Sequence, residues 1–320
     1  MRSLITGISG FAGGHLATEL LARDACVAGL DRGTSDQLAP LLDRIEFCEA
    51  DIRDGERLRG LAEAFRPETI FHLAALTHVA QAWEQRRATL EINVLGTATV
   101  LEVAAGLDPK PRVVLASSGQ VYGARPADSR PLTEEDPTTP QSPYAVSKRC
   151  AELLAEQVRI GDGVPTVILR TFNYTGPWQS PSFVCSDFAR QIARAEAGLQ
   201  EPVITVGNLD AARDFSDVRD IVRGYLLAAT DGEPGRVYNL CSGEAVPIAT
   251  ILDHLRAASR VDIRVVEDPE RLRRADLRVL RGDASRARRE LGWEPRFRLA
   301  ETLDAVLDFW RQRTSREDLE

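Results

Sequence analysis

The sequence predicts a doubly wound α/β fold, in which helices cover both faces of a parallel β-sheet. Three observations lead to this prediction. Short apolar runs alternate with helical patterns through the first half of the chain, and a glycine-rich turn follows the first run. The 320 residues are 43% apolar and 28% charged, the composition of an ordinary globular protein. This length suits one large domain, or a domain with a smaller lobe.

Strands and helices alternate in order up to Thr171. The first strand covers residues 3–6, and the glycine turn then leads into a helix with apolar Leu16, Leu20 and Leu21. Further strands are expected at CVAGLD, at IEFCEAD, at residues 68–75, at residues 112–118 and at PTVILRT. Helices are expected at residues 58–65, at residues 79–105 and around YAVSK. Such alternation favours parallel strands buried on both faces.

The regular alternation of strands and helices ends after Thr171. Helices are expected at residues 183–195, 218–229, 248–257, 285–291 and 299–312, separated by turns and short strands. We assign residues 1–171 to the sheet domain and residues 172–320 mainly to a smaller, mixed α/β lobe that covers the sheet. The two units are expected to interleave at their boundary.

Charge and cysteine content restrict the class of protein. A net charge of -8, with no basic block, disfavours a nucleic-acid partner. The five cysteines are odd in number and widely spaced, with no C-x-x-C, which indicates reduced thiols, a cytoplasmic protein and no metal site. No apolar leader and no apolar run near ~18 residues is visible, so we expect neither secretion nor membrane insertion.

Three glycines after the first strand predict a dinucleotide site. Gly7, Gly10 and Gly13 form G-x-x-G-x-x-G before a helix, where the backbone can approach a pyrophosphate at the helix N-terminus. Asp31 ends the second strand, close to the ~20-residue spacing at which an acid binds the adenosine ribose. This acid favours NAD(H), whereas the adjacent Arg32 leaves NADP(H) possible. A purely structural turn is the alternative.

The end of the third strand is a weaker candidate for cofactor contact. Asp51 and Ile52 are placed there to flank the adenine. An ordinary strand-end acid is the competing interpretation of Asp51.

YAVSK carries the candidate acid–base group. Tyr144 and Lys148 are four residues apart, so on a helix they address one ligand from the same face. Free tyrosine titrates near pH ~10, and a nearby positive charge favours its phenolate. The chain has only two lysines, Lys110 and Lys148. Ser118 ends the strand RVVLASS at the ligand-binding edge of the sheet and can hold a carbonyl oxygen while Tyr144 protonates it.

The motifs together resemble the extended short-chain dehydrogenases/reductases that act on nucleotide sugars. TGISGFAG, FHLAA, INVLGT, LASSGQVYG, YAVSK and RTFNYTGP occur in that family's order along nearly the whole chain. Within the family, the segments around residues 172–193 and 206–225 are most similar to GDP-6-deoxy-4-keto-mannose reductases and GDP-mannose 4,6-dehydratases. The resemblance implies an NAD(P)-binding Rossmann domain, a GDP-hexose substrate and a homodimer built from the helical region after Val79 and the helix with Tyr144.

Residue roles follow from the same resemblance. It makes Ser118, Tyr144 and Lys148 catalytic, with Lys148 also holding the nicotinamide ribose. Asn173 matches a substrate-contacting asparagine and Arg213 a diphosphate-facing arginine. The last correspondence places Arg273 as a second diphosphate contact, although Arg274 replaces a proline found in relatives. A solvated surface charge is the alternative for either arginine.

Gly119 and Gln120 depart from the pattern of the 4,6-dehydratases, which usually place two acids there. Without them, elimination lacks its acid–base pair. The sequence therefore favours a 4-keto reductase that forms a GDP-6-deoxyhexose such as GDP-rhamnose. A nucleotide-sugar 4-epimerase is the first alternative and a 4,6-dehydratase the second. A dinucleotide-binding sensor without catalysis is a remote one.

Overall fold

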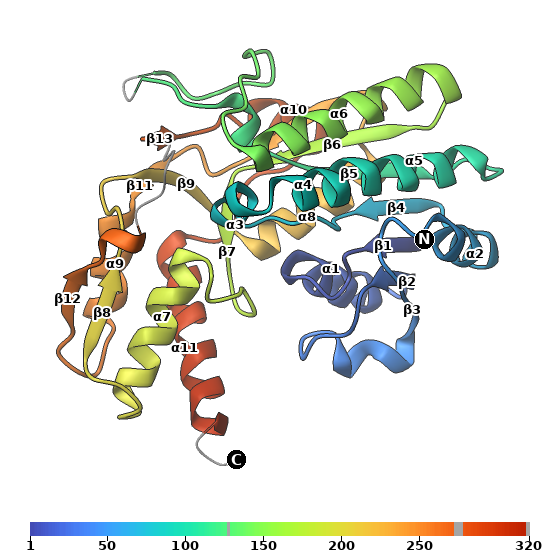
Figure 1. Cartoon of the computed structure of the whole chain (residues 1–320). Helices are drawn as coiled ribbons and strands as arrows, with labels where there is room; N and C mark the ends of the chain where they lie inside the picture. The colour runs from blue at the N-terminus through green and yellow to red at the C-terminus, as the bar shows by residue number, and fades with distance from the viewer. Residues whose placement is uncertain (127–128, 272–277, 318–320) are drawn as a thin grey trace.

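A seven-stranded parallel sheet forms the centre of the protein in the computed structural model, which describes residues 1–126, 129–271 and 278–317 (Figure 1). Its order is β10-β6-β5-β4-β1-β2-β3, so the winding reverses between β1 and β4, where such sheets bind ligands. The strands are β1 (Arg2–Thr6), β2 (Cys26–Asp31), β3 (Ile45–Glu49), β4 (Thr69–His72), β5 (Arg112–Ser118), β6 (Thr166–Thr171) and β10 (Val237–Leu240). The predicted doubly wound fold is confirmed.

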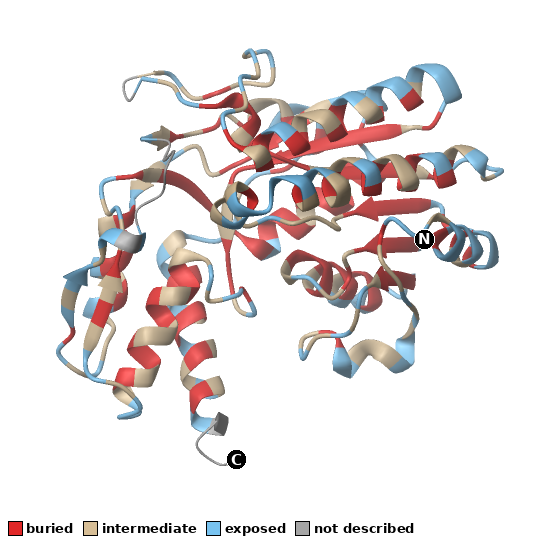
Figure 2. Ribbon diagram, in the orientation of Figure 1, coloured by how far each residue is buried: buried red, intermediate tan, exposed pale blue. Residues whose placement is uncertain are grey.

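Helices cover both faces of the sheet, and each layer encloses its own core (Figures 1 and 2). Buried Phe65, Val100 and Ala155 belong to the core of one face, and Leu16 and Ile221 to that of the other. The first layer contains α2 (Gly55–Phe65), α5 (Gly96–Gly106) and α6 (Pro143–Asp162); the second contains α1 (Phe11–Ala22), α8 (Val218–Thr230) and α10 (Ser285–Leu291). The described residues also form the short 3-10 helices η1 (Ala39–Arg44), η3 (Gly119–Tyr122) and η4 (Pro269–Arg271).

The helical region expected at residues 79–105 is present, but it is divided into successive segments. The structure has α3 (Val79–Glu84), α4 (Arg86–Leu90), the π-helical turn η2 (Glu91–Leu95) and then α5. Asn93 lies within the π turn and is its buried residue. Its Oδ1 accepts from the Leu76 backbone N–H at 2.8 Å and its Nδ2 donates to the Leu76 carbonyl at 3.0 Å, which holds this side chain inward.

The same stretch corrects the expectation about apolar length. Residues Arg86–Gly106 are helical and, by length and composition alone, long and apolar enough to cross a membrane. This is weak support for a membrane span, because core helices of soluble proteins have the same length and composition. Here α5 packs between α2 and α6, in the helical layer over the sheet.

A mixed lobe follows β6 and lies beside the carboxyl edge of the sheet (Figure 1). Helices α7 (Val184–Glu196), α9 (Ile248–Ala257) and α11 (Leu299–Glu317) pack together around a third core. Its strands are β7 (Asn173–Thr175), β8 (Val203–Val206), β9 (Ala212–Asp217), β11 (Ala245–Pro247), β12 (Arg264–Glu267) and β13 (Val279–Leu280). Because α8 and β10 return to the sheet domain, the chain crosses between the units more than once. The division at residue 171 stays a prediction.

Candidate active site

A cleft of about 1270 Å³ lies between the carboxyl edge of the sheet and the lobe. The glycine turn, the ends of β2, β4 and β5, and the first turns of α6 line one side. The first turns of α7 and the β9 region line the other. The cleft thus joins the predicted cofactor residues to the predicted substrate residues, and it is large enough for both ligands.

The glycine turn is shaped for a close approach of backbone to ligand. Gly7 has φ +76°, a conformation that side chains disfavour, and a Cβ there would lie 2.7 Å from the Ala74 nitrogen. A Cβ on Gly13 would lie 2.2 Å from the Gly7 carbonyl oxygen, so this glycine lets α1 pack onto the turn. Gly10 is the N-cap of α1, whose free N–H groups suit a pyrophosphate. These residues therefore fit a bound dinucleotide.

Asp31 is tied to the glycine turn at the cleft wall. Its carboxylate accepts from the backbone N–H groups of Ser9 at 3.0 Å and Arg32 at 2.8 Å. Arg32 is exposed and also lines the cleft. An acid and a guanidinium therefore stand side by side where an adenosine ribose is expected.

Asp51 and Ile52 both line the cleft, but the carboxylate of Asp51 is already engaged. Arg53 Nε donates to it at 2.8 Å, and this bond lowers the pKa of Asp51 to about 2. Ile52 is buried against Gly96. Contact between these two residues and adenine stays a prediction.

The end of β5 and the start of α6 bring Ser118, Tyr144 and Lys148 together. Ser142 caps α6 by accepting from the Ala145 N–H at 3.1 Å, so the helix begins just before Tyr144 and presents it to the cleft. The side chains of Ser118 and Tyr144 both line the cleft, and Ser118 is near enough to Tyr144 to influence the pKa of its phenol. Lys148 Nζ donates to the Ala116 carbonyl at 2.8 Å, immediately below Ser118 on the strand.

The electrostatics of Tyr144 differ from the expected pattern. Burial raises the pKa of its phenol to about 12, and the Ser118 side chain only partly opposes this shift. Burial also lowers the pKa of Lys148 to about 8. Desolvation therefore favours the neutral phenol of Tyr144 over the phenolate. At neutral pH Tyr144 keeps its proton, the form needed for proton donation.

The Ser117 hydroxyl is bound to Glu152 and is not available to a ligand in the cleft. It donates to Glu152 Oε1 at 2.6 Å, and Glu152 forms a buried ion pair with Arg170 at 2.8 Å. Sequence reasoning missed this pair. The available signal was the position of Glu152, one helical turn beyond Lys148 on the face that carries Tyr144.

Two further buried polar residues support the site without lining its reactive end. Asn93 Nδ2 donates to the Ser147 hydroxyl at 2.9 Å, which in turn donates to the Tyr144 carbonyl. His72 hydrogen-bonds Thr6 at 2.7 Å and Thr97 at 2.9 Å, and burial lowers its pKa to about 3. His72 is thus neutral and structural. Asn93 lies in INVLGT, a motif for which no role was predicted.

The predicted substrate residues lie on the lobe side. Asn173 begins β7 and Arg213 lies on β9, and both line the cleft. Arg213 Nη1 also donates to the Ala212 carbonyl at 2.8 Å. Arg273 lies outside the described residues. An arginine that was not predicted, Arg271, lines the cleft and pairs with Asp187 of α7.

Comparison with known proteins adds a family context. The profile of the GDP-mannose 4,6 dehydratase family matches residues 4–306. The chain is 37% identical over 316 residues to the GDP-6-deoxy-D-mannose reductase of Pseudomonas aeruginosa, covering 99% of both chains. It is 33% identical over 321 residues to the UDP-glucose 4-epimerase of Mycolicibacterium smegmatis, covering 98% of this chain and 100% of the relative. A Pseudomonas aeruginosa structure described as RMD complexed with NADPH superposes with a TM-score of 0.85 at 35% identity, covering 98% and 100% of the two chains.

Proposed function

We propose, on the premise that the chain belongs to the GDP-mannose 4,6-dehydratase family of extended short-chain dehydrogenases/reductases, that it is a 4-keto reductase of a GDP-4-keto-6-deoxyhexose. The product is a GDP-6-deoxyhexose such as GDP-rhamnose. The observation that carries this proposal is the meeting of buried Ser118, Tyr144 and Lys148 at one cleft, with no acid at the two positions after Ser118.

The residues divide the work of reducing one carbonyl. Bound NAD(P)H supplies a hydride to sugar carbon 4. The Ser118 hydroxyl orients the carbonyl oxygen, and the Tyr144 phenol donates its proton to that oxygen as the ketone becomes an alcohol. Lys148, protonated below about pH 8, stabilises the phenolate that remains until solvent returns the proton. The redox balance is one ketone reduced for each NAD(P)H oxidised.

Gly119 and Gln120 argue against a 4,6-dehydratase. A Cβ on Gly119 would lie 3.1 Å from the Phe172 ring, so an acid at this position would have to displace the ring. Gln120 lines the cleft, but an amide cannot exchange a proton as a general acid or base. The chain therefore lacks the pair that would remove water between carbons 5 and 6.

The second candidate is a nucleotide-sugar 4-epimerase. The full-length similarity to the UDP-glucose 4-epimerase of Mycolicibacterium smegmatis favours it, and epimerases use the same triad. An epimerase returns the hydride to the sugar and consumes no cofactor. Cofactor stoichiometry therefore separates the two candidates.

The function is tested by incubating the purified protein with GDP-4-keto-6-deoxy-mannose and reduced cofactor. We expect the absorbance of the reduced nicotinamide to fall by one equivalent for each sugar reduced. Tyr144→Phe is the control for adventitious reduction. An absence of turnover at high enzyme concentration, together with interconversion of an unoxidised GDP- or UDP-hexose, would replace the reductase with the epimerase.

For the cofactor we propose a preference for NAD(H), with NADP(H) also accepted. Asp31 stands where it can accept from both ribose hydroxyls, which favours NAD(H). The exposed Arg32 beside it supports use of the additional phosphate of NADP(H). We also propose that the protein is cytoplasmic, on the support of its unpaired, widely spaced cysteines.

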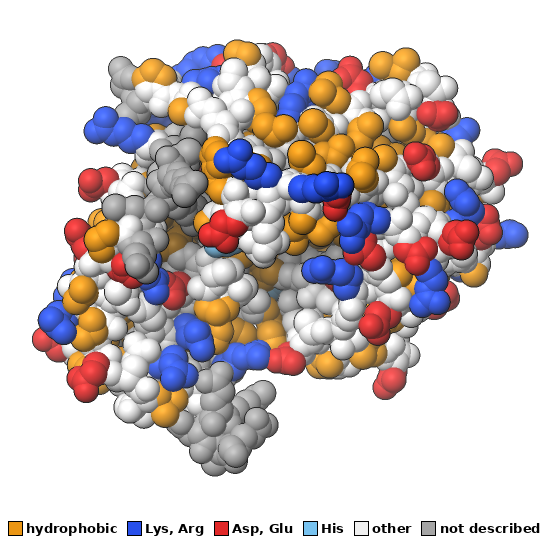
Figure 3. All heavy atoms as spheres, viewed as in Figure 1, with side chains coloured by type: hydrophobic (Ala, Val, Ile, Leu, Met, Phe, Trp, Pro, Cys, Tyr) orange, Lys and Arg blue, Asp and Glu red, His pale blue; other side chains and the backbone are white. Residues whose placement is uncertain are grey.

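We further propose a homodimer formed through the α6 patch, which we define as Leu90, Leu95, Val146, Leu153 and Ile160. All five are exposed large apolar residues. Three of them follow one another at seven-residue intervals along α6, and the others lie on α4 and η2, which pack against α6. Figure 3 shows hydrophobic side chains gathered where Figure 1 draws these helices. A second copy of α6 with the same spacing is the complementary occupant.

A further inference from the structure

A buried ion pair lies beneath the reactive end of β5. Glu152 Oε1 and Oε2 accept from Arg170 Nε and Nη2, each at 2.8 Å, and the two side chains are 1% and 5% exposed. Glu152 lies on α6 one turn beyond Lys148, and Arg170 on β6 is in register with Ser117 of β5. The pair therefore bridges α6 and β6 directly beside the strand that ends in Ser118.

The pair also holds both ends of one short segment, residues 117–122. At its start, the Ser117 hydroxyl donates to Glu152 Oε1 at 2.6 Å. At its end, Arg170 Nη1 donates to the Tyr122 hydroxyl at 3.0 Å, and the guanidinium lies 4.9 Å from the centre of the Tyr122 ring. Ser118 and Gln120 lie between these two anchors.

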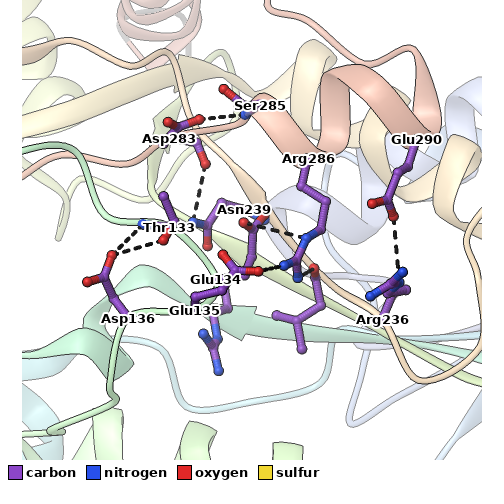
Figure 4. Close-up of polar contacts among 12 residues, drawn as sticks. Thr133, Glu134, Glu135, Asp136, Arg236, Asn239, Asp283, Ser285, Arg286 and Glu290 are labelled. Carbon is purple, nitrogen blue, oxygen red and sulfur yellow. Dashed lines mark hydrogen bonds and ion pairs between the residues drawn. The ribbon is translucent and has the colours of Figure 1, made fainter.

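The far anchor is itself fixed. The Tyr122 hydroxyl donates to Asn239 Oδ1 at 2.7 Å. Asn239 donates through Nδ2 to the Leu132 carbonyl at 2.9 Å and through its backbone N–H to Glu134 at 2.8 Å. Figure 4 shows Asn239 beside Glu134 and Asp283. Arg286 of α10 lies next to them and forms an ion pair with Glu134. Tyr122 is thus hydrogen-bonded to a polar network that includes residues of β10, α10 and the loop around residue 134.

The charges of the pair are kept rather than neutralised. Burial alone would raise the pKa of Glu152, but the hydrogen bonds from Arg170, Ser117 and Arg149 lower it. Buried ion pairs are often replaceable by apolar residues without loss of stability, so stability alone is a weak reason for this one. Its contacts point instead to the segment that carries Ser118.

We propose that Glu152 and Arg170 are positioning residues, which clamp residues 117–122 so that the Ser118 hydroxyl meets the Tyr144 phenol. The inference rests on the proposed function for its kinetic consequence. Within the clamped segment the Gln120 N–H donates to Ser118 Oγ at 3.2 Å, and Ser118 lines the cleft together with Tyr144. A displacement of either anchor therefore moves the hydroxyl that orients the substrate carbonyl.

The clamp is tested with Ser117→Ala and Tyr122→Phe, which each remove one hydroxyl from an anchor and leave Glu152 and Arg170 in place. Two matched controls remove equally buried hydroxyls elsewhere. Thr302→Val breaks a 2.8 Å hydrogen bond to the Asp217 carboxylate, and Tyr238→Phe removes a buried phenol on β10. All four proteins are compared by thermal unfolding, by amide hydrogen exchange and by kcat and KM for the 4-keto sugar.

We expect hydrogen exchange across residues 117–122 to quicken by about tenfold or more in the two anchor variants and to stay unchanged in the controls. We expect kcat to fall by about 10- to 100-fold in the anchor variants, because small misplacements cost that much, with the KM for the cofactor unchanged. The controls should stay within about twofold of the parent protein in kcat.

Unchanged exchange in both anchor variants would overturn the clamp, whatever the activity. An equal loss of kcat in Thr302→Val and Ser117→Ala would also overturn it, since general destabilisation would then explain both. A parent protein that does not reduce the 4-keto sugar would overturn the proposed function instead. The exchange measurement would still decide the clamp in that case, because it needs no substrate.

Discussion

The Glu152 carboxylate lies one turn of α6 beyond the buried Lys148 ammonium and stabilises its charge. Burial lowers the pKa of Lys148 to about 8, and Glu152 acts in the opposite direction. The carboxylate itself stays charged, since Arg170, Ser117 and Arg149 all donate to it. Glu152 therefore links the charge of Lys148 to the hydrogen-bond network formed by Arg170, Ser117 and Arg149.

This link predicts a pH dependence. Lys148 carries its charge below its pKa of about 8 and loses it above, so kcat/KM for 4-keto reduction should fall as the pH rises through about 8. In Glu152→Gln the opposing charge is gone, the pKa of Lys148 moves further down, and the fall should begin at lower pH. Steady-state rates between pH 6 and pH 10 measure this alkaline fall in the parent protein and in Glu152→Gln. If the fall occurs at the same pH in Glu152→Gln as in the parent protein, Lys148 is not the group whose titration causes it.

Removal of the Tyr144 hydroxyl should abolish most of the reaction. Tyr144→Phe takes away the proton donor, and we expect kcat to fall by about 10²- to 10⁴-fold. Binding of reduced cofactor, followed by its fluorescence, should be unchanged, because the glycine turn and Asp31 are untouched. Tyr238→Phe removes a fully buried phenol outside the cleft and should keep its activity. Comparable losses in both variants would mean that Tyr144 acts through the fold.

The glycine turn allows a paired test of the cofactor site. Gly13→Ala places a Cβ where the Gly7 carbonyl lies 2.2 Å away, and we expect a destabilisation of about 1–3 kcal/mol and loss of cofactor affinity. Gly33→Ala is the matched control, since a Cβ there meets no atom within 4 Å although Gly33 also lines the cleft. Urea unfolding and cofactor titration distinguish the two. Equal behaviour of both variants would contradict the close approach at Gly13.

Cofactor choice should depend on the two neighbours at the end of β2. Arg32→Ala removes a guanidinium suited to the ribose phosphate, so kcat/KM with NADPH should fall by about 10- to 100-fold. The value with NADH should stay within about twofold, because Asp31 and its contact to Ser9 remain. Parallel assays with the two cofactors measure the ratio. A loss with NADH alone would assign Arg32 a different role.

The α6 patch should determine the oligomeric state. Ile160 is 69% exposed and Leu153 49% exposed in the single chain. The double substitution Leu153→Glu and Ile160→Glu puts charges into the proposed interface and should convert a dimer into a monomer in sedimentation velocity. Leu199→Glu alters an exposed leucine on the lobe and should leave the dimer intact. A monomeric parent protein would contradict the proposed interface.

Local patterns in the sequence determined much of this protein. Alternating apolar runs predicted the sheet and its helices, because a strand between two helical layers must be apolar on both faces. The spacing of Gly7, Gly10 and Gly13 indicated the dinucleotide turn, since the backbone there must lie close to other backbone. Tyr144 and Lys148 could be paired from their helical spacing alone.

Contacts between distant residues were decided only by the tertiary structure. β10 completes the sheet from far along the chain, and Asn93 in the π turn bonds the backbone of Leu76, which lies outside the helical segments. The Glu152–Arg170 clamp joins a helix, a strand and the end of a neighbouring strand; helical spacing could place Glu152 beside Lys148, but it could not indicate Arg170 as its partner. The pKa of Tyr144 likewise depends on burial, which only packing determines. The sequence by itself thus indicated the candidate groups, and the folded chain decided their charges and what holds them in place.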